Sequence, residues 1–170
     1  QAGMPLEAVH NVAREHGLQY PVDFAARGSC SIGGNIATNA GGIRVIRYGN
    51  TREWVAGLKV VAGNGELLEF NKGLIKNSSG YDFRQLMIGS EGTLGIATRI
   101  ILRLLPKPEA RKTMLVAFAT IDGAAQAVSA IIRGKIIPTT LEFMDGSAID
   151  CVRQAAPLDL PTACRAVLII

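Results

Sequence analysis

The stretch SIGGNIATNAGGIRVIRYGNT, residues 31–51, holds four glycines within its first twelve positions. They stand as two pairs, Gly33-Gly34 and Gly41-Gly42, and Asn35 follows the first pair while Asn39 lies just before the second. Glycine has no Cβ, so such a backbone can approach a neighbouring group closely. The stretch therefore lies against either a ligand or another segment of protein, and the rest of the sequence bears on that choice.

The composition fits a globular protein and argues against several other classes. Of 170 residues, 48% are hydrophobic and 19% are charged, a balance typical of folded domains. The net charge is +4 and only 5% of the residues are aromatic, so we expect no nucleic-acid partner. The longest apolar run, near Ile96–Leu105, contains Arg99 and Arg103. Because a transmembrane helix needs ~18 apolar residues in succession, we expect no transmembrane segment.

The cysteines and the two ends of the chain give further expectations. Cys30, Cys151 and Cys164 are odd in number and widely spaced, which favours free thiols in a reducing compartment over a disulfide framework. We therefore expect a cytoplasmic protein, with a peripheral-membrane or organellar location left open. The sequence begins at Gln1 and ends on the apolar run RAVLII, and we expect it to be a fragment of a longer chain.

In the first part of the chain, residues 4–17 predict an amphipathic helix, with Pro5 in the first turn and Gly17 just past the end. Residues 54–70 predict a β-hairpin around Asn64-Gly65, a pair that suits a turn with two positive φ angles. One or two helical turns are expected within residues 81–89, and a strand within residues 95–106.

The pattern changes after Lys107-Pro108-Glu109, where we expect a domain boundary between residues 1–108 and 109–170. Strands are predicted at 113–120, 139–145 and 166–170, and helices at 121–134 and 146–156. Asp122 is the expected N-cap of the first of these helices, and its buried face is expected to hold Val128, Ile131 and Ile132. This β-α-β-α-β order indicates an α+β layer.

Four glycine-rich segments lie within 65 residues and are interleaved with predicted strands. Successive backbone N–H groups of such segments can form an anion-binding concavity, for which a diphosphate is a natural ligand. Tight turns and bulges would explain any single segment equally well. The segments are Gly33-Gly34-Asn35, Ala40-Gly41-Gly42, Ser79-Gly80-Tyr81-Asp82, and Gly89 to Gly95.

Several familiar sites are not supported. No GxGxxG follows a strand, no Walker loop is present around Lys76, and no GxSxG occurs. His10 and His16 are six residues apart in the predicted helix and off a common face, so we expect surface residues and no metal site. Cys30 has no base near it in the sequence, and we expect it to be a small buried packing residue.

Two blocks of sequence then resemble a specific family. CSIGGNIATNAGGIRVIRYGNTREWVAGLKVVAGNGELL and GLIKNSSGYDFRQLMIGSEGTLGIATRIILRLLPKP are similar to the FAD-binding domain of the flavin-linked 2-hydroxyacid dehydrogenases and oxidases, in the vanillyl-alcohol-oxidase group. The family includes D-lactate dehydrogenases, D-2-hydroxyglutarate dehydrogenases and the flavin subunit of glycolate oxidase. The resemblance implies the second half of a PCMH-type FAD-binding domain over residues 1–108. The start of an α+β, ferredoxin-like cap domain would follow over residues 109–170.

The resemblance also implies which residues contact FAD. The segment from Ser31 to Asn35 would run along the diphosphate and the flavin edge, the segment from Asn39 to Gly42 would continue that wall, and two later segments would close the site. The full expected set is Ser31, Ile32, Gly33, Gly34, Asn35, Asn39, Ala40, Gly41, Gly42, Gly80, Tyr81, Gly89, Glu91, Gly92, Gly95 and Ile96.

Some of these roles stay open on the sequence alone. Tyr81 fits a buried aromatic as well as a flavin contact, and Glu91 fits a turn cap as well as a functional residue. Arg47 and Arg52 could balance phosphate charge or lie on the surface. No histidine lies in the glycine stretch, which favours non-covalent FAD.

The same resemblance implies what these residues leave out. Family members carry a phosphate loop upstream, and a histidine-rich metal motif and substrate-binding arginines downstream; this chain matches none of these, and Leu141–Asp145 resembles only an early cap strand. The sequence therefore identifies no catalytic or metal residue.

The expected activity is oxidation of a D-2-hydroxy acid such as lactate, glycolate or 2-hydroxyglutarate to the 2-oxo acid, with an electron acceptor that the sequence does not identify. The alternatives are an FAD-fold nucleotide-binding or scaffold domain without redox activity, and a flavin reductase of cell-wall precursor synthesis. The cap-like segment argues against the reductase.

Overall fold

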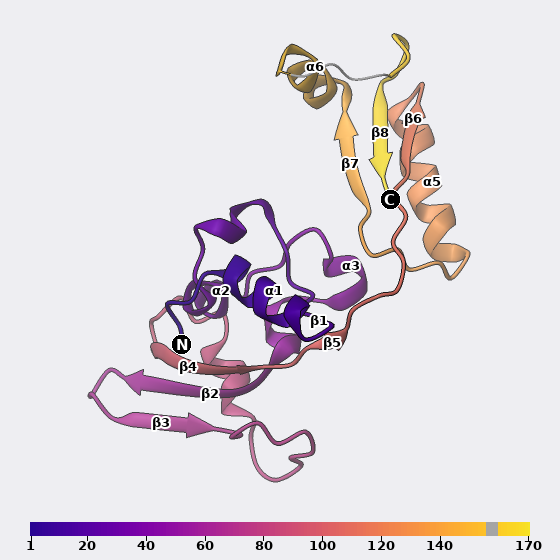
Figure 1. Cartoon of the computed structure of the whole chain (residues 1–170). Helices are drawn as coiled ribbons and strands as arrows, with labels where there is room; N and C mark the ends of the chain where they lie inside the picture. Colours follow the sequence, from indigo (N-terminus) through magenta and orange to yellow (C-terminus); the bar gives the residue numbers. More distant parts are fainter. Residues whose placement is uncertain (156–159) are drawn as a thin grey trace. The chain divides into compact units, whose positions relative to one another are not determined.

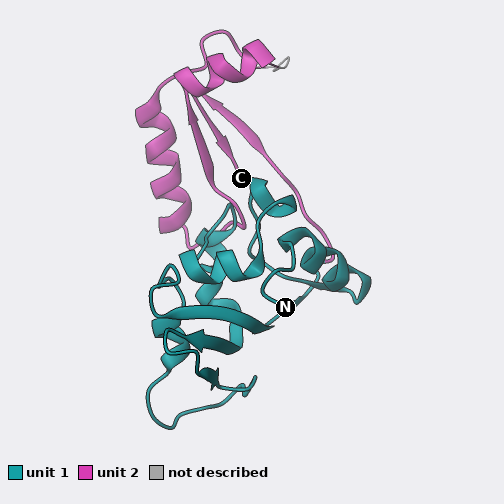
Figure 2. Ribbon diagram, turned by 90° about the vertical axis from the view of Figure 1, so that its left-hand side faces the viewer, with its two compact units in different colours: residues 1–108 teal, residues 109–170 magenta. Residues whose placement is uncertain are grey.

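The computed structural model describes residues 1–155 and 160–170, which form two compact units, Gln1–Pro108 and Glu109–Ile170 (Figure 2). Each unit combines helices with an antiparallel sheet (Figure 1), so the expected α+β class is confirmed. No helix in the described part of the chain has the length and apolar character needed to cross a membrane.

The first unit is built on a three-stranded sheet with strand order β3-β2-β4. The strands β2 (Val55–Ala62) and β3 (Leu67–Phe70) form the predicted hairpin, and β4 (Gly95–Leu102) pairs with the other edge of β2. A short pair, β1 (Leu18–Gln19) with β5 (Leu105–Pro106), accompanies it.

Short helices surround this sheet. The helix α1 (Leu6–Glu15) follows Pro5 and is followed by Gly17 at φ +68°, as the sequence predicts. The remaining helical elements of the unit are η1 (Ala25–Gly28), α2 (Ile32–Thr38), α3 (Val45–Tyr48), η2 (Thr51–Trp54) and α4 (Phe83–Met87).

The predicted turn of the hairpin is wrong in detail. Gly65 has φ +83°, but Asn64 is not among the residues with positive φ. Gly65 N donates to Ala62 O, and Ala62 N donates to Glu66 O. This is a three-residue loop in which a tight turn is followed by a left-handed glycine, a common alternative to the two-residue turn.

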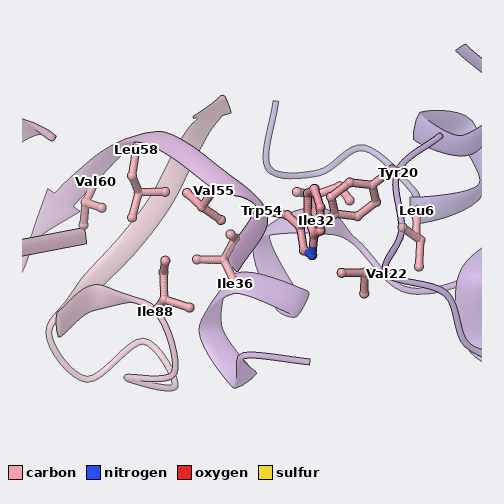
Figure 3. Close-up of a cluster of buried hydrophobic side chains, with 10 residues drawn as sticks. All are labelled: Leu6, Tyr20, Val22, Ile32, Ile36, Trp54, Val55, Leu58, Val60 and Ile88. Atoms are coloured by element: carbon pink, nitrogen blue, oxygen red, sulfur yellow. The ribbon is translucent and has the colours of Figure 1, made fainter. Parts of the chain in front are cut away.

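One hydrophobic core holds the first unit together (Figure 3). Its side chains come from α1, the extended segment after β1, α2, η2, β2 and the residue that ends α4, so segments far apart in the sequence pack against one another. The buried members are Leu6, Tyr20, Val22, Ile32, Ile36, Trp54, Val55, Leu58, Val60 and Ile88.

The second unit is a β-α-β-α-β arrangement with strand order β6-β8-β7. Its elements are β6 (Leu115–Phe118), α5 (Ile121–Arg133), β7 (Glu142–Asp145), α6 (Gly146–Ala155) and β8 (Ala166–Ile169). The last strand, β8, lies between the other two and is antiparallel to both. One core packs α5 on the sheet through Ala124 and Leu168, and another packs α6 through Ile149 and Val167.

Two expectations about α5 are corrected by the structure. The N-cap is Thr120, whose hydroxyl accepts from Gly123 N, while Asp122 lies in the first helical turn. A threonine with extended backbone before the helix meets the N-cap requirement directly. Val128 packs against the core and Ile131 is half-buried, but Ile132 is exposed because it lies at the edge of the face that Ala124, Ala127 and Val128 present to the sheet.

Two further expectations concerned side chains of the first unit. His10 is not a surface residue: its Nε2 lies 2.9 Å from Val22 O, and its side chain is 11% exposed. His16 is exposed, as expected. Cys30 is half-buried and packs beside the core, and all three cysteines are free.

Candidate functional site

The glycine stretch that opens at Ser31 folds into a short helix rather than an open loop. Ser31 is the N-cap of α2, and its Oγ accepts from Gly34 N at 3.1 Å. Ile32 and Ile36, one turn apart, are buried in the core, which fixes the helix against the sheet. Asn39 ends the helix in the left-handed conformation, at φ 49°, a position that asparagine tolerates well.

Much of the close backbone approach in this stretch is against protein. A Cβ on Gly33 would lie 2.9 Å from the Ala2 Cβ, and one on Gly41 would lie 2.9 Å from Val45. Gly42 has φ +117°, and a Cβ there would overlap Asp23 O. Gly34 is different, because it is exposed and its nearest atom belongs to Ser31.

The amide side chains also have protein partners. Asn35 is buried, and its Nδ2 donates to the Cys30 sulfur at 3.7 Å. Asn39 Oδ1 accepts from Arg52 N at 3.0 Å. Asn35 therefore uses its amide donor within the protein, whereas Asn39 uses only its amide oxygen. The Ser31 hydroxyl accepts from Gly34 N, and no described residue accepts its proton.

The structure brings two of the predicted segments together. Gly89 N donates to Ile36 O at 2.9 Å, and Glu91 N donates to Ala37 O at 2.8 Å. The turn after α4 is therefore fixed to the C-terminal end of α2. Glu91 and Gly92 both have positive φ, and both are exposed, so they present bare backbone beside α2.

Arg52 joins these segments a second time. Its Nη1 donates to Gln85 Oε1 at 2.9 Å and its Nη2 donates to Ile88 O at 3.0 Å. Thr51 fixes Ala40, the residue after Asn39, because the Thr51 hydroxyl donates to Ala40 O at 2.6 Å. Among the described residues no carboxylate lies within ion-pair distance of Arg52, so its positive charge is not neutralised locally.

A small pocket marks the place where these segments meet β2 and β4. It has a volume of about 10 Å³ and is lined by residues of four elements and the turn after α4: Ile36, Ala37, Leu58, Val60, Met87, Ser90, Gly92, Gly95 and Ala97. Gly95 is required there by its neighbours, since a Cβ would lie 2.5 Å from Val60. A pocket of this size holds about one water molecule, so a large ligand would lie on the open face and not inside it.

The remaining predicted residues are placed differently. Ile96 is 68% exposed on β4. Tyr81 is 89% exposed, and its ring packs edge-on against Phe83, so the alternative of a buried aromatic is wrong. No contact described for Gly80 or Tyr81 joins them to the turn at Gly89. Arg47 lies with its guanidinium 5.8 Å from the Tyr48 ring centre.

Two polar contacts of the first unit were not predicted from the sequence. Asp23 is buried, and its Oδ2 lies 2.7 Å from Arg44 Nη2. Arg84 donates to the carbonyls of Val55 and Ala56, and it also pairs with its near neighbour Asp82 at 2.6 Å. The Asp23–Arg44 pair and the bonds from Arg84 to the β2 carbonyls join residues far apart in the sequence, so no local pattern predicts them. No cluster of three or more potential metal ligands occurs within residues 1–155 and 160–170.

Comparison with known proteins adds two family matches. Residues 1–71 match the family described as FAD binding domain, and residues 107–170 match the family described as FAD linked oxidases, C-terminal domain. The two matches occur in this order along the chain, and the residues between them hold α4 and β4.

Similar curated proteins carry related names. A D-2-hydroxyglutarate dehydrogenase of Xanthomonas citri pv. viticola is 67% identical over 89% of this chain and 32% of its own length. The glycolate oxidase subunit GlcD of Bacillus subtilis is 49% identical over 91% of the chain and 33% of its own length. A D-lactate dehydrogenase of Archaeoglobus fulgidus is 38% identical over 88% of the chain and 33% of its own length. The chain thus spans about a third of the relatives it matches.

Solved structures agree on the fold. An alkyldihydroxyacetonephosphate synthase has a TM-score of 0.83 at 21% identity, over 99% of this chain and 33% of that protein. At this identity the likeness concerns the fold alone.

Proposed function

We propose that the chain forms part of an FAD-linked enzyme that oxidises a D-2-hydroxy acid, such as lactate, glycolate or 2-hydroxyglutarate, to the 2-oxo acid, because residues 1–71 match the FAD binding domain and residues 107–170 match the C-terminal domain of FAD linked oxidases. Residues 1–108 would be part of the FAD-binding domain and residues 109–170 part of the substrate-binding cap domain. Relatives named for D-2-hydroxyglutarate, glycolate and D-lactate support this class of substrate.

The observation that carries the proposal is the junction of α2 with the turn after α4. Arg52 donates from its backbone to Asn39 Oδ1 and from its guanidinium to Ile88 O, so it links Asn39 to the residue directly before the Gly89–Gly92 turn. The positive charge of Arg52 has no carboxylate partner among the described residues, which suits a diphosphate. The face is open and glycine-rich, so an extended cofactor can approach the backbone closely.

The residues of this chain would bind and orient the cofactor. The Ser31 hydroxyl and the bare backbone at Gly34 and Gly92 would lie against the diphosphate and the ring system, and the segments Asn39–Ala40 and Gly89–Glu91 would continue this surface. FAD supplies the redox chemistry when bound, and a protein tunes that chemistry through the groups it places near the ring. No histidine that could bond covalently to the flavin lies in the glycine stretch, so the cofactor would be non-covalent.

The free thiols bear on the location that we propose. All three cysteines are free in the structure, and free thiols persist in reducing compartments. This supports a cytoplasmic protein.

The test uses the full-length enzyme, meaning a protein in which residues 1–170 stand within the whole length typical of the relatives. The purified protein should be yellow, release FAD on denaturation, and lose its flavin absorbance anaerobically on addition of D-lactate, glycolate or D-2-hydroxyglutarate. L-enantiomers of the chiral substrates are the control and should act much more slowly. A colourless protein from which no FAD is released would overturn the proposal. FAD that is retained but reduced by none of these acids would favour a binding domain without redox activity.

A further inference from the structure

Asp23 is a buried carboxylate that the proposed cofactor contacts leave unexplained. It is 4% exposed, and its Oδ2 lies 2.7 Å from Arg44 Nη2, whose side chain is itself only 12% exposed. The other oxygen, Oδ1, faces Arg27 Nη1 at 3.4 Å and His10 Nδ1 at 3.8 Å. Arg27 differs from Arg44 in that its side chain is half exposed.

The main chain of Asp23 contacts the same segment as its side chain. Asp23 O accepts from Ile43 N at 3.0 Å. Gly42 lies so close to this carbonyl that any Cβ would overlap it. Residues 42–44 are therefore held to Asp23 by a backbone hydrogen bond, a close backbone approach and an ion pair, all within three successive residues.

Asp23 is in turn fixed to the core. The preceding residue, Val22, has its side chain in the main hydrophobic cluster, and its carbonyl lies 2.9 Å from His10 Nε2 on α1. The carboxylate thus stands on a rigid part of the fold, while its partner Arg44 closely follows the second glycine pair.

We propose that Asp23 and Arg44 form a positioning pair that fixes residues 39–42 in the geometry needed to contact FAD. This inference rests on the proposed function. A buried ion pair gains little net stability, because desolvation of the two charges offsets their attraction, so its consequence lies in where it holds the chain. A loop held in its bound geometry before the ligand arrives binds more tightly, since less ordering is required on binding.

The test compares four variants of the full-length enzyme. Asp23→Asn and Arg44→Gln each remove one charge of the pair, and Arg44→Lys keeps the charge but loses the guanidinium geometry. Arg27→Gln is the matched control, because it removes an arginine from the same carboxylate without touching residues 42–44. FAD affinity, the visible circular dichroism of the bound flavin, and amide hydrogen exchange of the peptide over residues 39–44 are measured for each.

If the pair has this positioning role, Asp23→Asn and Arg44→Gln should each lower FAD affinity about tenfold or more. The circular dichroism of the bound flavin should change, and the amides of residues 39–44 should exchange faster. Arg44→Lys should recover part of the affinity, and Arg27→Gln should resemble the wild type. Should Asp23→Asn fail to fold, Arg44→Gln and Arg44→Lys decide the question.

Two results separate this inference from the proposed function. If folded Arg44→Gln protein binds FAD within about twofold of wild type, below the loss expected from a disordered loop, and its residues 39–44 exchange at the wild-type rate, the positioning role is wrong and the proposed function stands. If wild-type protein binds no FAD, the proposed function fails. The exchange measurement still decides whether the pair fixes the loop.

Discussion

The glycines of the glycine-rich segments are required for different physical reasons. Gly42 is required by protein atoms, since its φ is +117° and a Cβ would overlap Asp23 O. Gly92 has φ +78° but a Cβ there would meet no other atom within 4 Å, and a Cβ on the exposed Gly34 would approach only Ser31 Oγ, at 3.3 Å. Gly42 is therefore fixed by a distant segment of the chain, whereas the requirements at Gly34 and Gly92 are local and leave their outer faces open.

We predict that Gly42→Ala lowers the free energy of unfolding by about 2 kcal/mol or more, because the new methyl group combines backbone strain with a steric overlap. Gly63→Ala is the matched control: its Cβ would meet nothing within 4 Å, and its φ is not positive. Chemical denaturation of the full-length enzyme measures both. Equal stabilities of the two variants would show that the chain near Asp23 relaxes freely.

The buried hydroxyl of Tyr20 is expected to lower the free energy of unfolding. It is 1% exposed, and its hydroxyl forms no hydrogen bond with any described residue. Burial raises the pKa of Tyr20, and the Thr51 hydroxyl lowers that pKa by a smaller amount. The Thr51 proton is directed to Ala40 O, so it is not donated to the phenol oxygen.

Tyr20→Phe should therefore leave the free energy of unfolding unchanged or raise it by up to about 1 kcal/mol, because an unsatisfied buried hydroxyl is removed while the ring remains. Tyr20→Ala is the contrast and should cost about 3–5 kcal/mol through the cavity it leaves. Denaturant unfolding distinguishes the two. A loss of about 1 kcal/mol or more in Tyr20→Phe would mean that the hydroxyl has a hydrogen-bond partner in solution.

At the scale of elements, Arg84 links α4 to β2. The pairing of β2 with β4 shifts register between Val55 and Gly57, and such a bulge leaves the extra residue out of the ladder. The Ala56 carbonyl is satisfied instead by Arg84 Nη1 at 2.9 Å and Asn71 Nδ2 at 2.8 Å. Long side chains from two later segments thus complete the hydrogen bonding of a buried strand.

Arg84→Ala should lower the free energy of unfolding by about 1–2 kcal/mol, since it removes a charged donor from the Val55 and Ala56 carbonyls. Arg99→Ala is a suitable control because Arg99 is exposed on β4. Thermal unfolding of the two variants in parallel is the measurement. Equal effects would indicate that water replaces the guanidinium at these carbonyls.

Because Asp82 pairs with Arg84, it makes the free energy of unfolding depend on pH. The hydrogen bond from Arg84 lowers the pKa of Asp82 below its ordinary value of 3.8. A carboxylate with a lowered pKa stabilises the folded state above its unfolded pKa, and this contribution is lost as the pH falls through the folded value. The Asp82 side chain is 42% exposed, so solvent screens the pair and we expect an effect of about 0.5 kcal/mol or less. Asp82→Asn should therefore lower the free energy of unfolding relative to wild type at about pH 6. The difference should shrink as the pH falls through the folded-state pKa of Asp82, as measured by urea unfolding at a series of pH values.

The elements also show where sequence reasoning succeeds. Helix α1, the hairpin of β2 and β3, and the strands and helices of the second unit follow from periodicity and turn residues. Helix α2 was not predicted, since a glycine-rich stretch disfavours a helix, yet its signals are local: a serine cap at Ser31 and buried isoleucines at Ile32 and Ile36. The burial of His10 and the Asp23–Arg44 pair could not be predicted, since both depend on contacts between distant segments.

At the scale of the whole molecule, the candidate site lies in a unit that also exposes large apolar side chains. Among them are Tyr81, Phe83, Leu86 and Ile96. Exposed apolar surface of this kind commonly marks contact with another protein segment or a ligand. The chain spans about a third of its relatives' length, and in proteins of that length the additional segments would be able to cover such a surface.

We therefore predict that residues 1–170 alone bind FAD at most weakly, whereas the full-length enzyme binds it tightly. A ligand that binds only the folded state raises stability by about 2.7 kcal/mol at a hundredfold excess over its dissociation constant. Excess FAD should thus raise the melting temperature of the full-length enzyme by several degrees and that of residues 1–170 by less than about 1 °C. AMP serves as a control for binding through the adenine end alone. A large shift for residues 1–170 with FAD would mean that this face is a nearly complete cofactor site, and that the contacts made by the rest of the enzyme contribute little to affinity.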